Sequence, residues 1–181
     1  NVTKGWDHDP PAKEKLVPFG VLMLATGVLT LLFGTAETSD FWGDCLRVWW
    51  GSVSSQCRKV RRVVIYLDNG PKNSGSRTQF LKRMIEFADW SGLEIRLVYY
   101  PPYHSKYNPV ERFWGGLEQH WNGDLLDSTT AVLTFAKTMT WNQQHPVVTL
   151  VHPLYHKGVR LSKKAMALLE QRLQRLAGLQ K

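Results

Sequence analysis

An uncharged segment near the start of the chain places the strongest constraint on its fold. Residues 16–36 contain no Asp, Glu, Lys or Arg, and this length is close to the roughly 20 residues of a membrane-spanning helix. The segment also contains a proline and three glycines, and its middle consists of two β-rich runs on either side of a Thr-Gly turn. A buried antiparallel hairpin is therefore the favoured interpretation, with a membrane helix as the alternative.

The chain after this segment alternates between helical and strand-like patterns. A helix-start signal at Thr38 precedes apolar residues at helical spacing as far as Trp50. Residues 63–67 are a continuous apolar run that stops at Asp-Asn-Gly, which predicts a central strand buried on both faces. An amphipathic helix is expected over residues 74–91, with Gly92 at its end.

A further strand and helix complete the pattern. Residues 93–100 predict a strand that the following two prolines end, and a helix is expected to start at Asn108. The order hairpin, helix, strand, helix, strand, helix predicts an α/β fold, with a mixed sheet flanked by helices. No internal repeat interrupts this order.

The last part of the chain has the pattern of a basic amphipathic helix. From Leu161 to Leu176, leucine and alanine residues share one helical face. We therefore divide the chain into a domain over residues 1–158 and a C-terminal helix over residues 159–181. This helix is expected to dock on the domain or on a partner helix, and a DNA contact by its outer face is the alternative.

Composition indicates a soluble domain with an anionic partner. Of the 181 residues, 43% are hydrophobic and 21% are charged, which suits one domain with a buried core. The formal net charge is +8, and its clustering favours a polyanion such as nucleic acid, with solvated helix faces as the alternative. The two cysteines lack metal-ligand spacing, and a reducing, cytoplasmic location is expected. The basic clusters are Arg58, Lys59, Arg61 and Arg62, then Arg77, Lys82 and Arg83, then Lys163, Lys164, Arg172 and Arg175.

Asp68 directly follows the predicted strand over residues 63–67. In α/β sheets, ligand sites form at the carboxyl ends of strands, so a carboxylate there can hold a metal ion. The tripeptide Asp-Asn-Gly also suits a simple turn, because Asp and Asn form Asx-turns and Gly accepts a positive φ. On the tripeptide alone the turn is favoured, and the metal site stays open.

Glu111 also has two interpretations. In Asn108-Pro109-Val110-Glu111, the asparagine can be the N-cap, the proline the first helical residue and the glutamate the third, which is the arrangement of a capping box. The same carboxylate is also well placed to face Asp68 across the end of the sheet. Spacing alone does not decide between a cap and a ligand.

The residues around Glu111 favour the ligand. His104 and Lys106 precede it and can hold phosphate groups, and Trp114 follows it after one helical turn. Mg²⁺ takes oxygen ligands from one or two carboxylates and leaves room for phosphate oxygens. These are the parts of a phosphoryl-transfer site that acts on DNA.

Three segments carry a resemblance to a known family. "YLDNGPKNSGSRTQFLKRMIEFAD", "YYPPYHSKYNPVERFWGGLEQHWNG" and "TMTW" together resemble the DDE transposases of bacterial insertion sequences. The resemblance is to the Rhodopirellula-type group, which is related to the Tc/mariner superfamily, and it covers about residues 7–158. The Asp-Asn-Gly-Pro and Pro-Pro-Tyr-His-Ser-Lys-Tyr-Asn-Pro-x-Glu-Arg motifs are highly specific.

The resemblance implies an RNase H-like fold in which two aspartates and a glutamate bind two divalent ions, Mg²⁺ or Mn²⁺. One ion would activate water or a DNA 3′-hydroxyl for attack on a phosphodiester, and the other would stabilise the leaving oxygen. Asp68 matches the second aspartate and Glu111 the glutamate, so both are expected to be catalytic metal ligands. The implied activity is DNA strand cleavage and strand transfer during transposition of an insertion sequence.

The first aspartate of the family has no clear match. In the family it lies on the first strand of the sheet, in an Asp-x-Lys setting ahead of the hairpin. Asp7 and Asp9 are the aspartates ahead of the hairpin here, but Pro10 and Pro11 prevent a central strand from continuing through them. We therefore expect a sheet that lacks its first strand and a catalytic domain truncated at its N-terminus, with Asp7 or Asp9 as the alternative source of the ligand.

The resemblance also implies DNA as the partner, both insertion-sequence ends and target. Asn69, Arg77, His104, Lys106 and Arg112 are the residues expected to bind it. Transposases commonly act as dimers on paired ends, so a homodimer is the expected assembly, without a membrane partner. Two other functions stay open: a catalytically incomplete DNA-binding remnant of a transposase, and a membrane-associated protein built on the uncharged segment.

Overall fold

The uncharged segment forms two paired strands. In the computed structural model, which describes residues 16–68, 70–101, 107–121 and 128–176, β1 (Val17–Leu22) and β2 (Leu29–Gly34) pair antiparallel. Backbone N–H groups of Thr26 and Gly27 close the turn on Met23 O, at 3.2 and 2.8 Å. The hairpin prediction is confirmed, and no helix in the described ranges is long and apolar enough to cross a membrane.

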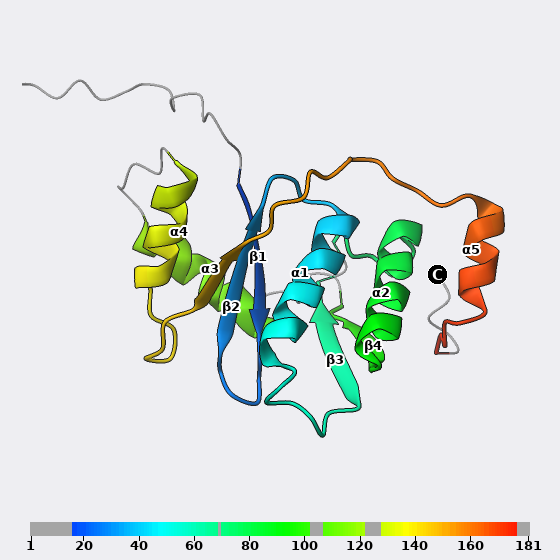
Figure 1. Cartoon of the computed structure of the whole chain (residues 1–181), viewed down its shortest axis with the longest axis horizontal. Coiled ribbons are helices and arrows are strands. Elements are labelled where there is room, and N and C mark those ends of the chain that lie inside the picture. Colours follow the sequence, from blue (N-terminus) through cyan, green and yellow to red (C-terminus); the bar gives the residue numbers. More distant parts are fainter. Residues whose placement is uncertain (1–15, 69, 102–106, 122–127, 177–181) are drawn as a thin grey trace, which may run out of the picture.

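The strands form two sheets (Figure 1). β5 (Val147–Leu150) runs parallel to β2, which gives the order β1-β2-β5. β3 (Arg62–Leu67) and β4 (Glu94–Tyr99) form a separate parallel pair. Mixed strand directions together with five helices confirm the α/β class. The single sheet expected from the sequence is wrong for the part of the chain that the structure describes, where two sheets stand apart.

Helices α1 (Ser39–Val53) and α2 (Thr78–Ser91) lie side by side and cover one face of both sheets (Figure 1). Thr38 caps α1, because its Oγ1 accepts a hydrogen bond from Phe41 N at 3.1 Å, as the helix-start signal predicts. α2 begins at Thr78 rather than at residue 74, since turns occupy the preceding residues. Gly92 ends it with a φ of 69°, as expected.

Two cores form on opposite faces of the three-stranded sheet. The larger contains the apolar faces of α1 and α2 with inward side chains of β1, β3 and β4. The smaller lies between the other face of β2 and the helices α3 (Pro109–His120) and α4 (Thr129–Thr138). The three-stranded sheet is therefore covered on both faces, which holds α3 firmly in place.

The β3 strand is not buried on both faces. Ile65 and Leu67 pack into the larger core, whereas Val64 and Tyr66 are 40% and 46% exposed. Although the apolar run is continuous in sequence, α1 and α2 cover only one of its faces, and β4 is its one strand partner among the described residues. The prediction of a central strand buried on both faces is wrong for these residues.

The C-terminal helix is shorter than expected. α5 covers only Lys163–Glu170 and leaves Leu168 64% exposed, so the predicted apolar face is not buried. Beyond it, Arg175 pairs with Glu170 and donates a hydrogen bond to Gly75 O at 3.2 Å. The bond to Gly75 O links this segment to the loop that precedes α2.

Candidate active site

Asp68 stands at the carboxyl end of β3. The strand end is fixed against β4, because Tyr100 N donates a hydrogen bond to Leu67 O at 2.8 Å. The Asp68 side chain is exposed, and its Oδ1 accepts hydrogen bonds from Gly70 N (3.2 Å) and Asn73 Nδ2 (2.8 Å). The turn interpretation of Asp-Asn-Gly is thus confirmed, and the turn holds the carboxylate at the end of the strand.

Glu111 lies in the first turn of α3. Asn108 is the N-cap, its Oδ1 accepts a hydrogen bond from Val110 N at 3.4 Å, and Pro109 is the first helical residue. Within the described ranges, no hydrogen bond links the Glu111 carboxylate back to Asn108, so the capping box is not formed. The cap therefore leaves the Glu111 carboxylate available for another role.

Close packing against the sheet fixes the position of α3. Phe113 and Leu117 are completely or almost completely buried in the smaller core. On β1, Gly20 lets the Trp114 ring approach so closely that a Cβ there would lie 3.0 Å from its Cζ2 atom. Because Glu111 precedes Trp114 by three residues, it shares the helix face that meets the sheet.

Asp68 and Glu111 interact electrostatically although they lie in different parts of the fold. Burial raises the pKa of Glu111, and the negative charge of Asp68 raises it further. In the described part of the chain, neither carboxylate forms an ion pair with Lys or Arg. Two neighbouring carboxylates without a cationic partner are a suitable donor set for a divalent cation.

The surrounding atoms also fit a hydrated ion such as Mg²⁺ or Mn²⁺. The amide oxygen Oδ1 of Asn73 is buried and has no hydrogen-bond donor among the described residues. Mg²⁺ usually keeps several waters, which can donate hydrogen bonds to such an atom. The described residues hold no cluster of three or more His, Cys, Asp or Glu side chains suited to a metal.

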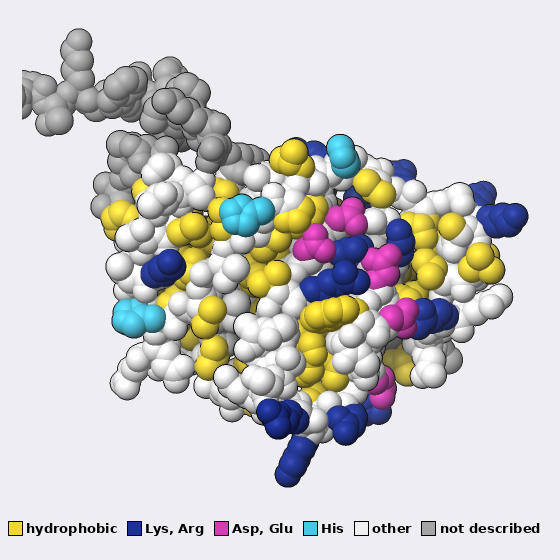
Figure 2. Space-filling model, viewed as in Figure 1, with side chains coloured by type: hydrophobic (Ala, Val, Ile, Leu, Met, Phe, Trp, Pro, Cys, Tyr) yellow, Lys and Arg dark blue, Asp and Glu magenta, His cyan; other side chains and the backbone are white. Residues whose placement is uncertain are grey.

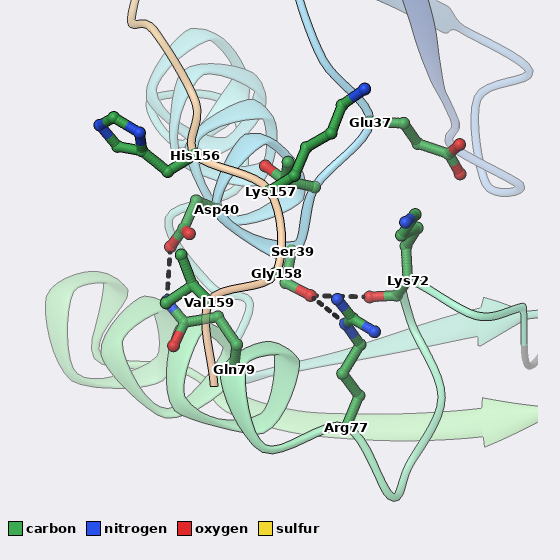
Figure 3. Close-up of a pocket in the computed structure, with 11 residues that line it drawn as sticks. Glu37, Ser39, Asp40, Lys72, Arg77, Gln79, His156, Lys157, Gly158 and Val159 are labelled. Atoms are coloured by element: carbon green, nitrogen blue, oxygen red, sulfur yellow. Dashed lines mark hydrogen bonds between the residues drawn. The ribbon is translucent and has the colours of Figure 1, made fainter. Parts of the chain in front are cut away.

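Arg77, expected to bind DNA, also makes a structural contact. It is the residue before α2, and its Nε donates a hydrogen bond to Ser39 Oγ at 3.2 Å. Ser39 Oγ in turn donates to Lys72 O at 2.9 Å, so the beginnings of α1 and α2 are tied together (Figure 3). One of the five guanidinium N–H donors of Arg77 is thus used within the protein.

A small surface pocket of about 10 Å³ opens beside this contact (Figure 3). Neither Asp68 nor Glu111 lines it. Basic and acidic side chains share its wall, which makes it a mixed polar surface rather than a basic one. The lining residues are Glu37, Thr38, Ser39, Asp40, Lys72, Arg77, Gln79, His156, Lys157, Gly158 and Val159.

The other predicted site residues divide into two groups. Arg112 is exposed on α3, directly after Glu111, where a DNA backbone can reach it. Asn69, His104 and Lys106 lie outside the described residues, as do both candidates for the first aspartate, Asp7 and Asp9.

Asn73 is the site residue that the sequence did not reveal. It is 2% exposed and bonds Asp68, although it lies in a Gly-, Ser- and Asn-rich stretch that reads as a surface loop. The one available signal was its place shortly after the carboxylate. That signal does not distinguish a buried donor from an ordinary turn residue.

The fold defines a mixed α/β protein, and the charge of Asp68 acts on Glu111 within it. The sequence model of a family described as the Rhodopirellula transposase DDE domain matches residues 1–180. The chain therefore belongs to this family of DDE transposases, enzymes that act on DNA. Comparisons with curated proteins and with solved structures gave no match.

Proposed function

We propose that this chain is the RNase H-like catalytic domain of an insertion-sequence transposase, which cleaves DNA and transfers its strands with Mg²⁺ or Mn²⁺. The observation that carries the proposal is the pair formed by Asp68 and Glu111. They come from two separate elements, and the charge of Asp68 raises the pKa of Glu111. Membership of the DDE transposase family supports the same function.

In this proposal the two carboxylates hold divalent ions through their oxygen atoms. Two such ions, when bound, supply activation of the attacking water or 3′-hydroxyl and stabilisation of the leaving oxygen. The chain provides the two negatively charged carboxylates and holds them in place. Gly70 N and Asn73 Nδ2 hold the Asp68 carboxylate, and the positive end of the α3 dipole favours negative charge at Glu111. Arg112 would contact the DNA backbone beside them.

We also propose that a further strand lies between β1 and β3 in the complete sheet. Both strands pack under α1 in one core, and each has a single strand neighbour among the described residues. A strand between them would join the two sheets into one and satisfy both exposed backbone edges. It would also bring its own side chains to the end of β3, where a first aspartate is expected. Asp7 or Asp9 is the alternative source of that ligand.

The test is strand cleavage and strand transfer by the full-length protein carrying Asp68→Asn or Glu111→Gln. Loss of an outer-shell partner typically costs roughly 10- to 100-fold in activity, so removal of a metal ligand should cost at least that much. DNA binding should be retained, because neither change removes a basic residue.

Glu118→Gln is the matched control. Glu118 is an exposed residue of the same helix, and this variant should cleave DNA like the unmodified protein. Full cleavage by either Asp68→Asn or Glu111→Gln would refute the assignment of that residue.

A second candidate function is a DNA-binding remnant without catalysis. The lack of a cluster of three ligands among the described residues favours it. Calorimetry with Mn²⁺ separates the two functions, since tight binding of two ions to this chain excludes the remnant. A chain that binds DNA but does not bind Mn²⁺ would favour the remnant.

A further inference from the structure

Asn73 is a buried polar residue that forms a hydrogen bond with the Asp68 carboxylate of the candidate site. It lies in the loop between β3 and α2, is 2% exposed, and donates a hydrogen bond from Nδ2 to Asp68 Oδ1 at 2.8 Å. The reverse orientation of its amide would bring two acceptor oxygens together. The chemistry of the contact therefore places the NH₂ group toward Asp68.

The backbone of Asn73 is anchored on both sides. Its N–H donates to Gly70 O at 3.2 Å, and its C=O accepts a hydrogen bond from the Tyr99 hydroxyl at 3.1 Å. Tyr99 is the last residue of β4 and is paired in register with Leu67, the residue before Asp68. Burial raises the pKa of Tyr99 to about 12, so its hydroxyl stays protonated and remains a donor near neutral pH.

Gly70 allows this close arrangement. A Cβ at Gly70 would lie 3.3 Å from Asp68 Oδ2, 3.4 Å from Asp68 Oδ1 and 3.5 Å from Asn73 Oδ1. A side chain at Gly70 would therefore begin in tight contact with the Asp68 carboxylate. Asp68 is exposed to solvent on its other side but is held from within the protein.

We propose that Asn73 is a positioning residue, which orients the Asp68 carboxylate for a divalent cation. The inference rests on the proposed function, because it gives Asn73 a role toward the same metal site. The bond to Asp68 is the one hydrogen bond of the Asn73 side chain among the described residues, and its Oδ1 is buried without a protein donor. Partners of this kind fix metal ligands in one orientation.

The test is the affinity of the complete 181-residue chain for Mn²⁺, measured by calorimetry on Asn73→Leu. Leucine has a similar volume and removes the donor, and Asp68 can replace the lost bond with water. The Mn²⁺ affinity should fall roughly 10- to 100-fold. Asn73→His, which keeps an N–H donor, should recover part of that loss. Asn73→Ala takes the place of Asn73→Leu if the latter shows no cooperative thermal melt.

Tyr99→Phe is the control for a merely structural role. It loosens the same loop but keeps the Asn73 side chain, so its Mn²⁺ affinity should stay within a few-fold of the unmodified chain, as a lost neutral hydrogen bond remote from the ligand has a small effect. Equal losses in Tyr99→Phe and Asn73→Leu would overturn the positioning role, as would unchanged affinity in Asn73→Leu.

Asp68→Asn separates this inference from the proposed function. If Asp68→Asn loses Mn²⁺ binding and Asn73→Leu does not, only the role of Asn73 is wrong. If Asp68→Asn binds Mn²⁺ like the unmodified chain, the metal site itself is wrong, and the role of Asn73 falls with it.

Discussion

At the scale of residues, the chain holds two negative charges near each other at the end of β3. Asp68 is kept in place by Gly70 N and Asn73 Nδ2, and Glu111 is partly buried in the first turn of α3. Without a bound cation, this arrangement disfavours the ionised form of Glu111, as its raised pKa shows. Ionisation of Glu111 therefore costs some folding stability.

The pH dependence of stability should reveal this cost. The folded pKa of Glu111 lies above its unfolded value, so the folded state binds this proton more readily and stability falls as pH rises through that window. In chelator-treated protein, Glu111→Gln should melt at a higher temperature than the unmodified chain at pH 7, and the difference should shrink by pH 4. Thermal melts across this range measure it, and a difference that grows toward acid pH would contradict it.

Several site residues could be predicted from the sequence because their signals are local. Asp68 ends an apolar run, and Asn108 and Pro109 are a cap and a first helical residue, whatever the rest of the fold does. Asn73 could not be predicted, because its role depends on burial beneath Asp68 and on Tyr99, which is 26 residues away. Local patterns do not encode such tertiary contacts.

At the scale of elements, β1 and α3 determine where Glu111 lies. The Trp114 ring sits over Gly20 in the middle of β1, and Phe113 and Leu117 anchor the same helix in the smaller core. Because interiors are close-packed, a helix in such contact transmits small shifts rather than absorbing them. Gly20 in β1 therefore has a packing role that affects the position of Glu111 at the start of α3.

Gly20→Ala should displace α3 from β1. The added methyl group would lie 3.0 Å from Trp114 Cζ2, and overpacking of this kind typically costs about 1–3 kcal/mol. Denaturant unfolding should show that loss, and Mn²⁺ affinity should fall with it. The control is Gly115→Ala in α3 itself, where nothing lies within 4 Å and a gain of about 0.5–1 kcal/mol is expected. Equal stability of the two variants would contradict this packing role.

The elements could be predicted better than their arrangement. The hairpin, the caps of α1 and α3, and Gly92 at the end of α2 follow from local signals, and the structure confirms them. The burial of β3 was predicted wrongly, because an apolar run reports the hydrophobicity of both faces but not whether an element covers each face. The strand β5 had no sequence expectation, since its position depends on parallel pairing with the distant β2.

At the scale of the whole molecule, part of the basic charge is paired with acidic side chains within the chain. Arg83 contacts Asp40, Asp44 and Glu86, and Figure 2 shows acidic and basic side chains interleaved over the α1 and α2 face. Arg172 pairs similarly with Asp89. In contrast, the cluster of Arg58, Lys59 and Arg61 is exposed between α1 and β3, at the end of β3 opposite Asp68 (Figures 1 and 2).

DNA affinity should therefore depend on particular basic residues rather than on net charge. If DNA lies across the carboxylate end, Arg112→Ala should lower the slope of log affinity against log salt concentration by about 1, the effect of one phosphate contact. Lys59→Ala, at the far end of β3, should leave the slope unchanged. Fluorescence anisotropy over a salt series measures both, and a slope change in Lys59→Ala alone would place DNA on the opposite end.

The most direct measurement of the central claim is a calorimetric titration of the chain with Mn²⁺, compared with Asp68→Asn, Glu111→Gln and the control Glu118→Gln. A shared metal site predicts that both site variants lose Mn²⁺ binding, while Glu118→Gln binds like the unmodified chain. If the unmodified chain binds Mn²⁺ and either site variant binds it equally well, then Asp68 and Glu111 do not form one metal site.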